Sequence, residues 1–243
     1  MPCITRFAPS PTGYLHLGHA YSALRTADAA EAAGGRFLLR IEDIDSARSR
    51  PEFEDAIFED LAWLGLSWET PVRRQSEHLD VYQQALETLS ARSLIYPCFC
   101  SRREIRAEIA QAGAAPHGPG GALYPGTCRA LSEEIRDQRI AAGDAYALRL
   151  DVARAGTEAG PLIWREQGRG DIAGDAASYG DVVLALKETP ASYHLAVTLD
   201  DHLQGITLVT RGEDLFEATH IHRLLQALLC ALAVSLFCAC VRA

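Results

Sequence analysis

The chain has 243 residues, of which 48% are hydrophobic, so it can build one large domain with a sizeable core, with or without an insertion. The formal net charge of −9 excludes a general affinity for nucleic acid, and an RNA partner would need a local basic patch. The chain contains seven cysteines, an odd number, and its first residues do not form a signal peptide. Both observations favour a reduced, cytoplasmic setting over a disulfide framework.

The first stretch of the chain predicts a strand, a loop and a helix. Residues 3–7 have the pattern of a short buried strand, and Pro9, Pro11 and Gly13 then make the chain turn. From Leu17 onward apolar residues recur at helical spacing, until a pair of glycines ends the helix. In α/β folds, nucleotides bind in the crevice beyond the carboxyl end of such a strand.

Two histidines flank a glycine at the start of this helix. His16 and His19 lie three residues apart, and Gly18 between them lets a flat ligand approach the backbone closely. The free N–H groups and the partial positive charge of a helix start suit phosphate. Without further evidence, the two histidines could equally be solvated loop residues with no role in phosphate binding.

The whole stretch resembles a known nucleotide-binding signature. Residues 6–19, Arg-Phe-Ala-Pro-Ser-Pro-Thr-Gly-Tyr-Leu-His-Leu-Gly-His, resemble the ATP-binding motif of the class I aminoacyl-tRNA synthetases, and the first eight are similar to the glutamyl and glutaminyl branch. The resemblance extends from residue 4 to about residue 229. It implies an α/β fold with a doubly wound, Rossmann-like parallel sheet, with His16 and His19 as catalytic residues. The ATP contacts that it implies are Pro9, His16, Gly18 and His19.

A second buried strand is expected at 36–41, parallel to the first, with acidic residues at its carboxyl end. On the charge pattern alone, Glu42, Asp43 and Asp45 favour helix caps over ligands for an ammonium group or a metal. The run Leu-Leu-Arg-Ile-Glu-Asp-Ile-Asp, however, resembles the second motif of the synthetase family. That resemblance implies that Glu42 binds the amine of the amino-acid substrate.

The same resemblance implies an amino-acid pocket whose charges match glutamate. Its residues would be Arg6, Ala8, Ser10, Glu42, Tyr193 and Arg211. Guanidinium groups suit planar carboxylates and a carboxylate suits an ammonium group, so the set favours glutamate over glutamine, which lacks the second negative charge. On local pattern, Tyr193 is equally an ordinary aromatic strand residue, and Arg211 is equally a partner of Glu213 or Asp214.

A segment from about residue 96 to 150 is expected to be an insertion between the halves of the nucleotide-binding fold. It holds Cys98 and Cys100 and, after a stretch rich in glycine and proline, Tyr124 and Cys128. Three thiolates and a phenol can surround Zn²⁺ tetrahedrally, although reduced cysteines are also common core residues. The combined pattern resembles the zinc module of the glutamyl-queuosine tRNA(Asp) synthetases, short paralogues of glutamyl-tRNA synthetase. It implies one structural Zn²⁺ bound by these four residues.

The remaining elements follow from periodicity and from capping residues. Helices are expected at 51–64, from Ser76 to about residue 89, and at 132–143 and 218–229; strands are expected at 145–150, 181–186, 193–199 and 207–214, with irregular structure at 151–180. We therefore divide the chain into a first catalytic half at 1–95, the insertion at 96–150, a second catalytic half at 151–229 and an apolar tail at 230–243.

The tail departs from the family pattern. The resemblance implies a lysine-bearing second ATP signature after residue 229, yet Lys187 is the one lysine of the chain and the sequence there is apolar. Residues 224–241 approach the length of a membrane span, but Gln226 interrupts them and the run beyond Cys230 is only about a dozen residues. We therefore expect no membrane anchor, an aggregation-prone end and slow activation.

These observations lead to one expected function and two alternatives. By resemblance, the chain activates L-glutamate with ATP and Mg²⁺ and attaches it to queuosine in the anticodon of tRNA(Asp); we expect a monomer. The first alternative is a fragment of glutamyl-tRNA synthetase that charges tRNA(Glu). The second is a non-catalytic, zinc-bearing nucleotide-binding module, which glutamate-dependent ATP turnover would distinguish from either enzyme.

Overall fold

The computed structural model describes residues 2–101, 103–105, 117–118, 121–187, 189–230 and 237–241. Its α-helices are α1 (Leu17–Ala32), α2 (Pro51–Trp63), α3 (Leu79–Ala91), α5 (Glu133–Ala141), α6 (Val152–Ala159), α7 (Tyr193–Leu203) and α8 (Ala218–Leu229). Its strands are β1 (Ile4–Phe7), β2 (Arg36–Ile41), β3 (Arg73–Arg74), β4 (Ile95–Cys98), β5 (His117–Gly118), β6 (Gly121–Ala122), β7 (Ala147–Leu150), β8 (Ile163–Glu166), β9 (Gly170–Ala173), β10 (Val183–Ala185), β11 (Leu208–Gly212) and β12 (Phe237–Val241). Short 3₁₀ helices are η1 (Gln75–His78), η2 (Thr127–Ala130), η3 (Ala176–Tyr179) and η4 (Glu213–Leu215).

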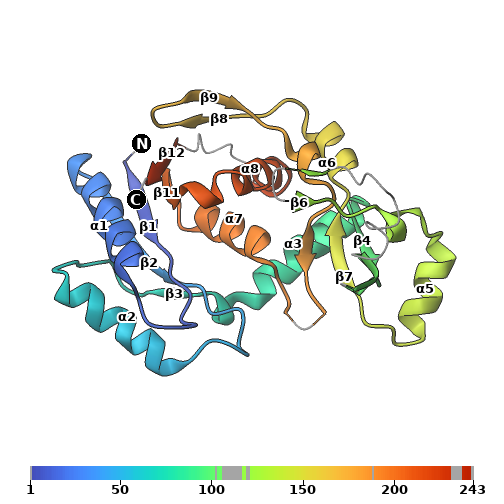
Figure 1. The fold of residues 1–243 in the computed structure, drawn as a ribbon, viewed down its shortest axis with the longest axis horizontal. Coiled ribbons are helices and arrows are strands. Elements are labelled where there is room, and N and C mark those ends of the chain that lie inside the picture. Colours follow the sequence, from blue (N-terminus) through green and yellow to red (C-terminus); the bar gives the residue numbers. More distant parts are fainter. Residues whose placement is uncertain are drawn as a thin grey trace.

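A parallel sheet takes strands from both halves of the chain (Figure 1). β1 pairs in parallel with β2, and β2 with β3. A second ladder runs β11-β12-β8 in parallel, with β9 antiparallel to β8. The two ladders meet where the N–H of Thr207 donates to the carbonyl oxygen of Ile4 at 3.0 Å. The α/β fold with a parallel sheet that the sequence predicts is therefore confirmed.

Alternate residues of β1 and β2 face opposite sides of this sheet, as a pleated strand requires. One set packs with α1 and α2 in a single core cluster: Phe7, Phe37, Leu39 and Ile41. The positions between them carry Arg6 and Arg40, which turn to the other face and reach Asp201 on α7. Strand periodicity therefore places two arginines beside a helix on the face opposite α1 and α2 (Figure 1).

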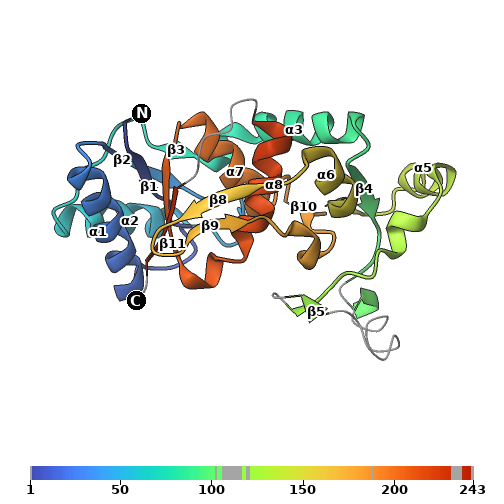
Figure 2. The ribbon, with the colours of Figure 1, turned by 90° about the horizontal axis from the view of Figure 1, so that it is seen from above.

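A smaller antiparallel sheet joins the cysteine-bearing segment to the second half of the chain. β7 pairs with β4 on one side and with β10 on the other. A core cluster with side chains from α3, α6, α7 and α8 packs against it. Because β7 ends at residue 150 and β10 lies after it, this sheet crosses the boundary that we drew between the insertion and the second catalytic half. Figures 1 and 2 show it at the opposite end of the molecule from α1.

Residues 193–203 form the helix α7, so the strand predicted at 193–199 is wrong. The side chains from Leu195 to Asp201 are all buried, and a short, mostly apolar run does not distinguish a buried helix from a strand. Two flanking signals distinguish them. Ser192 occupies the N-cap position, and Gly205 follows the helix with a positive φ of 66°.

The stretch 151–180 is also not irregular, contrary to our expectation. Asp151 caps α6, because its side chain accepts a hydrogen bond from the N–H of Arg154 at 3.1 Å. β8 and β9 then form a hairpin whose turn contains Gly168, with a positive φ of 80°. These elements have only 8, 4 and 4 residues, and α6 and β9 are rich in alanine and glycine, so their periodicity is weak.

Part of the apolar tail has a place in the sheet. Residues 237–241 form β12, between β11 and β8. All five pair with β11 and the first two also pair with β8, although we expected them to belong to an aggregation-prone end. The glycine- and proline-rich stretch expected before Tyr124 lies partly outside the described residues. Among the residues that the structure describes, every helix is too short or too polar to cross a membrane.

Candidate active site

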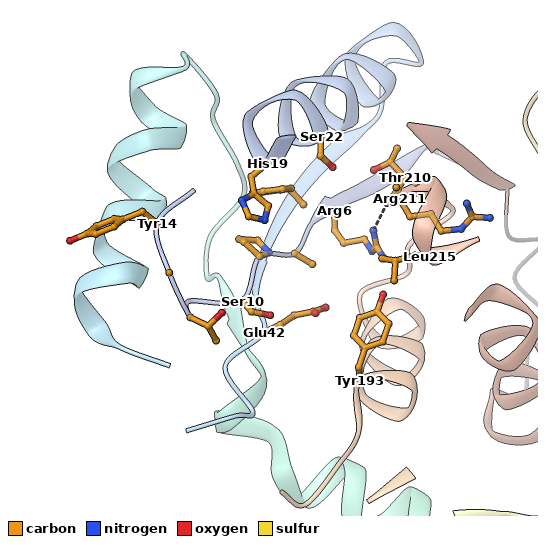
Figure 3. A pocket seen from close by; sticks show the side chains of 16 residues that line it. Arg6, Ser10, Tyr14, His19, Ser22, Glu42, Tyr193, Thr210, Arg211 and Leu215 are labelled. Atoms are coloured by element: carbon orange, nitrogen blue, oxygen red, sulfur yellow. Dashed lines mark hydrogen bonds between the residues drawn. The ribbon is translucent and has the colours of Figure 1, made fainter. Parts of the chain in front are cut away.

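A cavity of about 380 Å³ opens where β1, β2 and β11 end, against the first turn of α7. All six residues expected for the amino-acid pocket line it: Arg6, Ala8, Ser10, Glu42, Tyr193 and Arg211. Of the expected ATP contacts, Pro9 and His19 line it, whereas His16 and Gly18 lie at the exposed start of α1. Figure 3 shows His19 on the α1 side of the cavity and Tyr193 on the opposite side, with Arg6 and Glu42 between them.

The two histidines cap the helix that carries them. The Nδ1 atom of His16 accepts from the N–H of Gly18 at 3.1 Å, and the N–H of His16 donates to Nδ1 of His19 at 3.2 Å. Because Nδ1 is an acceptor in both rings, each neutral imidazole carries its proton on Nε2. Burial and, secondarily, the neighbouring His16 ring lower the pKa of His19, which keeps it neutral near pH 7. The start of α1 therefore offers two Nε2–H donors.

Gly18 is required by this arrangement. A Cβ atom at residue 18 would lie 3.0 Å from Cε1 and 3.2 Å from Nδ1 of His16, closer than packed side chains normally approach. The glycine therefore lets the imidazole of His16 cover the backbone amide. The backbone N–H groups that we expected to meet phosphate are, at Gly18 and His16, already bonded to imidazole.

A chain of buried ion pairs links the ends of the amino-acid pocket. Arg6 donates through Nε to Oδ1 of Asp201 at 2.8 Å, and through Nη1 to the carbonyl oxygen of Thr210 at 3.2 Å. Arg40 donates to the same Asp201 oxygen at 2.7 Å and to Oε1 of Glu42 at 3.0 Å. Asp201 therefore holds Arg6 directly and orients Glu42 through Arg40.

A neighbouring carboxylate anchors this network to the core. Asp200 is fully buried and accepts from Nε of Arg73 at 2.8 Å, from Gln75 at 2.8 Å and from the hydroxyl of Tyr82 at 2.9 Å. Sequence reasoning missed Asp200 and Asp201, which directly follow the strand expected at 193–199. The available signal was a pair of adjacent acids that continues an apolar run, since buried carboxylates need paired cations.

The pKa values of Glu42 and Asp201, the two carboxyl groups joined by Arg40, are shifted in opposite directions. Burial raises the pKa of Glu42 above its usual range, because the opposing attraction of Arg40 is the smaller effect. Burial also disfavours the charge of Asp201, but Arg6 and Arg40 together outweigh it and lower the pKa. Glu42 is therefore a buried carboxylate, paired with Arg40, whose negative charge a further cation such as an ammonium group would stabilise.

Arg211 is held by residues from two other elements. Its Nε donates to the hydroxyl of Thr219 at 2.9 Å, and its Nη2 donates to Oε2 of Glu166 at 2.8 Å. Neither Glu213 nor Asp214, the partners that we considered on local pattern, forms this ion pair. Glu166 lies on β8, within the stretch that we expected to be irregular, so sequence reasoning missed it as well.

Tyr193 and the loop after β1 add uncharged groups to the cavity. Tyr193 is the first residue of α7, and its ring makes an edge contact with His222 at 5.4 Å between centroids. Burial and, secondarily, the charge of Glu42 raise the pKa of Tyr193, so its hydroxyl remains a donor. The N–H of Glu42 donates to the carbonyl oxygen of Pro9 at 3.0 Å, which ties this loop to the end of β2.

Soft ligand atoms meet at the far end of β4. The Sγ atoms of Cys98, Cys100 and Cys128 all lie within 4.8 Å of one another. The hydroxyl of Tyr124 lies 3.4 Å from Sγ of Cys98 and 3.7 Å from Sγ of Cys100. Ligands of a tetrahedral zinc ion at about 2.3 Å are separated by about 3.8 Å, so these four side chains fit such an ion.

Comparison with known proteins gives a consistent result. The sequence profile of the catalytic domain of the class I tRNA synthetases for E and Q matches residues 2–238. A glutamyl-Q tRNA(Asp) synthetase of Rhodobacter capsulatus is 53% identical over 232 residues, which are 93% of this chain and 82% of that protein. A glutamate–tRNA ligase of Coprothermobacter proteolyticus is 38% identical over 213 residues, covering 86% of this chain but only 44% of that protein.

The fold agrees with these matches. The crystal structure of a glutamate–tRNA synthetase from Elizabethkingia anophelis superposes with a TM-score of 0.82 at 30% identity. The superposition covers all of this chain and 50% of the other. The chain thus spans most of the length of the glutamyl-Q relative and about half of the length of the glutamate–tRNA enzymes.

Proposed function

Because the chain belongs to the catalytic-domain family of the class I tRNA synthetases for glutamate and glutamine, we propose that it activates L-glutamate with ATP and transfers it to queuosine of tRNA(Asp). The proposal of glutamate rests on the charges that line the cavity. Arg6 and Arg211 offer two guanidinium groups, and Glu42 offers a carboxylate whose charge is disfavoured by burial. Glutamate carries the complementary set of two carboxylates and one ammonium group.

In the proposed reaction, the α-carboxylate of glutamate attacks the α-phosphorus of ATP. A new P–O bond forms to the carboxylate oxygen, and the bond to the bridging oxygen of the β-phosphate breaks, so glutamyl adenylate and pyrophosphate result. Such a phosphoryl centre is accelerated mainly by positioning and by neutralisation of charge. Mg²⁺ bound to the phosphates would neutralise part of that charge. The glutamyl group then passes to queuosine, and AMP leaves.

The histidine pair would donate hydrogen bonds to the phosphates of ATP. His16 and His19 keep Nδ1 occupied within the helix cap and expose Nε2–H, which suits hydrogen bonds to phosphate oxygens. Both rings can do this in the neutral form, so they need no proton from solvent. Ala8, Pro9, Ser10 and Gly18 belong to the backbone that surrounds the two substrates, and Tyr193 would donate its hydroxyl to glutamate.

Two measurements test the proposal. Pyrophosphate exchange with glutamate and ATP alone should proceed without tRNA, because all the proposed pocket residues lie in one cavity. Charging of queuosine-containing tRNA(Asp) should then exceed charging of tRNA(Glu). Exchange that requires tRNA, together with charging of tRNA(Glu), would instead identify a fragment of glutamyl-tRNA synthetase. Absence of any glutamate-dependent turnover, with retained ATP binding, would identify a non-catalytic module.

We also propose one structural Zn²⁺ bound by Cys98, Cys100, Tyr124 and Cys128. The spacing of the three sulfur atoms and the phenol oxygen supports it, and four protein ligands leave no open catalytic position. Metal analysis of the purified protein should find about one zinc per chain. Cys100→Ser should lower the content, whereas Cys3→Ser, at a cysteine remote from this cluster, should not. Unchanged zinc in Cys100→Ser would refute the assignment.

A further inference from the structure

A second, smaller cavity lies behind the amino-acid pocket, between β11, α7 and α8. Its volume is about 20 Å³, enough for one water molecule but not for a substrate. It shares Arg6, Tyr193 and Arg211 with the larger cavity, so the same side chains separate the two. Gln226, the residue that interrupts the apolar run of α8, lies on the far wall.

Two buried polar atoms belong to residues of this cavity and have no hydrogen-bond partner in the part of the chain that the structure describes. One is Nη1 of Arg211, a donor, and the other is Oε1 of Gln226, an acceptor. A buried polar group that is left unpaired destabilises the protein, and a charged group does so more than a neutral one. One is a donor and the other an acceptor, and both residues line a space of the volume of one water molecule.

We propose that this cavity holds an ordered water molecule that accepts from Nη1 of Arg211 and donates to Oε1 of Gln226. Asp201 also lines the cavity and offers a carboxylate to the second hydrogen of the water. In Arg211, Nε already donates to Thr219 and Nη2 to Glu166. The water would bind the third nitrogen, so the whole guanidinium group would be held in place. Gln226 is therefore a positioning residue for Arg211.

This inference rests on the proposed function, because Arg211 matters as a glutamate contact. A guanidinium held at all three nitrogens keeps its plane when the substrate carboxylate arrives, so less conformational freedom is lost on binding. Gln226→Leu keeps nearly the same volume but removes the acceptor. Gln84→Leu, on the exposed face of α3, is the matched control for the same change of chemistry.

The test measures affinity by calorimetry and the water by crystallography. Gln226→Leu should raise the dissociation constant for glutamate about tenfold and leave that for ATP within about twofold, while Gln84→Leu changes neither. A high-resolution crystal structure should show a water hydrogen-bonded to both Arg211 and Gln226, which Gln226→Leu lacks.

Three outcomes overturn the inference: unchanged glutamate affinity in Gln226→Leu, equal weakening of glutamate and ATP, or no ordered water bonded to both atoms. Failure of the unsubstituted protein to bind glutamate would refute the proposed function instead. In that case the crystal structure still decides whether the water is present.

Discussion

The amino-acid pocket and the cysteine cluster are built in opposite ways. In the pocket, Arg6 and Arg211 each have a buried carboxylate partner distant in sequence, Asp201 and Glu166. In the cluster, the ligand atoms from Cys98 to Cys128 mainly contact one another. The pocket therefore carries its own counter-charges and is organised before any substrate arrives, whereas the cluster has soft ligand atoms that a metal would organise.

Removal of the proposed zinc should have the largest effect on local structure, and this effect should be confined to the cysteine cluster. A strong chelator should abolish hydrogen-exchange protection around η2 and the end of β4, since zinc contributes on the order of 10 kcal/mol in small zinc domains. The affinity for glutamate should change by less than about twofold, because the pocket does not use these ligands. Equal loss of protection in β1, β2 and α7, measured by mass spectrometry, would show that the regions are not independent.

Asp201→Ala should cause the largest loss of stability among single substitutions in the pocket. It leaves Arg6 and Arg40 buried without their shared carboxylate, and removal of one partner of a buried pair costs about 3–5 kcal/mol. Urea denaturation measures this free energy. The matched control is Asp28→Ala, whose pair with Arg25 is exposed and should contribute at most about 1 kcal/mol. Similar values for the two variants would contradict the preorganised pocket.

Arg211→Ala should weaken glutamate much more than ATP. Loss of one buried, charge-assisted contact costs about 2–5 kcal/mol in binding, which calorimetry measures directly. Arg165→Ala removes an arginine from an exposed pair with Asp171 and should leave both affinities unchanged. If Arg211→Ala lowers the affinity for glutamate and for ATP equally, Arg211 stabilises the fold through its ion pair with Glu166 and does not bind glutamate.

Gly18→Ala should change stability little but affect the histidine pair. Alanine is favoured over glycine in a helix by about 1 kcal/mol, whereas displacement of His16 from its cap costs about 0.5–2 kcal/mol, so the two effects nearly cancel. Pyrophosphate exchange should nevertheless fall, since the His16 ring would leave its position. Nuclear magnetic resonance of the imidazole protons checks the displacement, and an unmoved ring with unchanged exchange would contradict it.

Acidification should have the smallest effect on glutamate affinity, and this effect should depend on Glu42. Burial raises the pKa of Glu42, so on acidification it becomes protonated before an ordinary glutamate does and loses its attraction for an ammonium group. Glutamate affinity should therefore begin to fall at a pH above 4.5, the ordinary pKa of such a group. In Glu42→Gln the affinity should be lower and flat over the same range. A similar decline in both proteins would assign the effect to another group.

The features that could be predicted from the sequence are those carried by residues close together in the chain. His16, Gly18 and His19 form one turn, and the strand alternation around Arg6 and Arg40 is also local. The partners of Arg6 and Arg211 were missed, because Asp201 and Glu166 approach these two arginines only through the tertiary fold. The helix α7 was missed because a buried helix and a buried strand have the same apolar composition over a short run.

The position of β12 has a consequence for biosynthesis. It follows every other described strand in the chain, yet it lies between β11 and β8. The two flanking strands therefore leave the ribosome before the strand that joins them, and until then each presents an unpaired edge to solvent or to a chaperone. The ion pair between Arg211 on β11 and Glu166 on β8 spans this late position, so the pocket can take its final form only after the sheet closes.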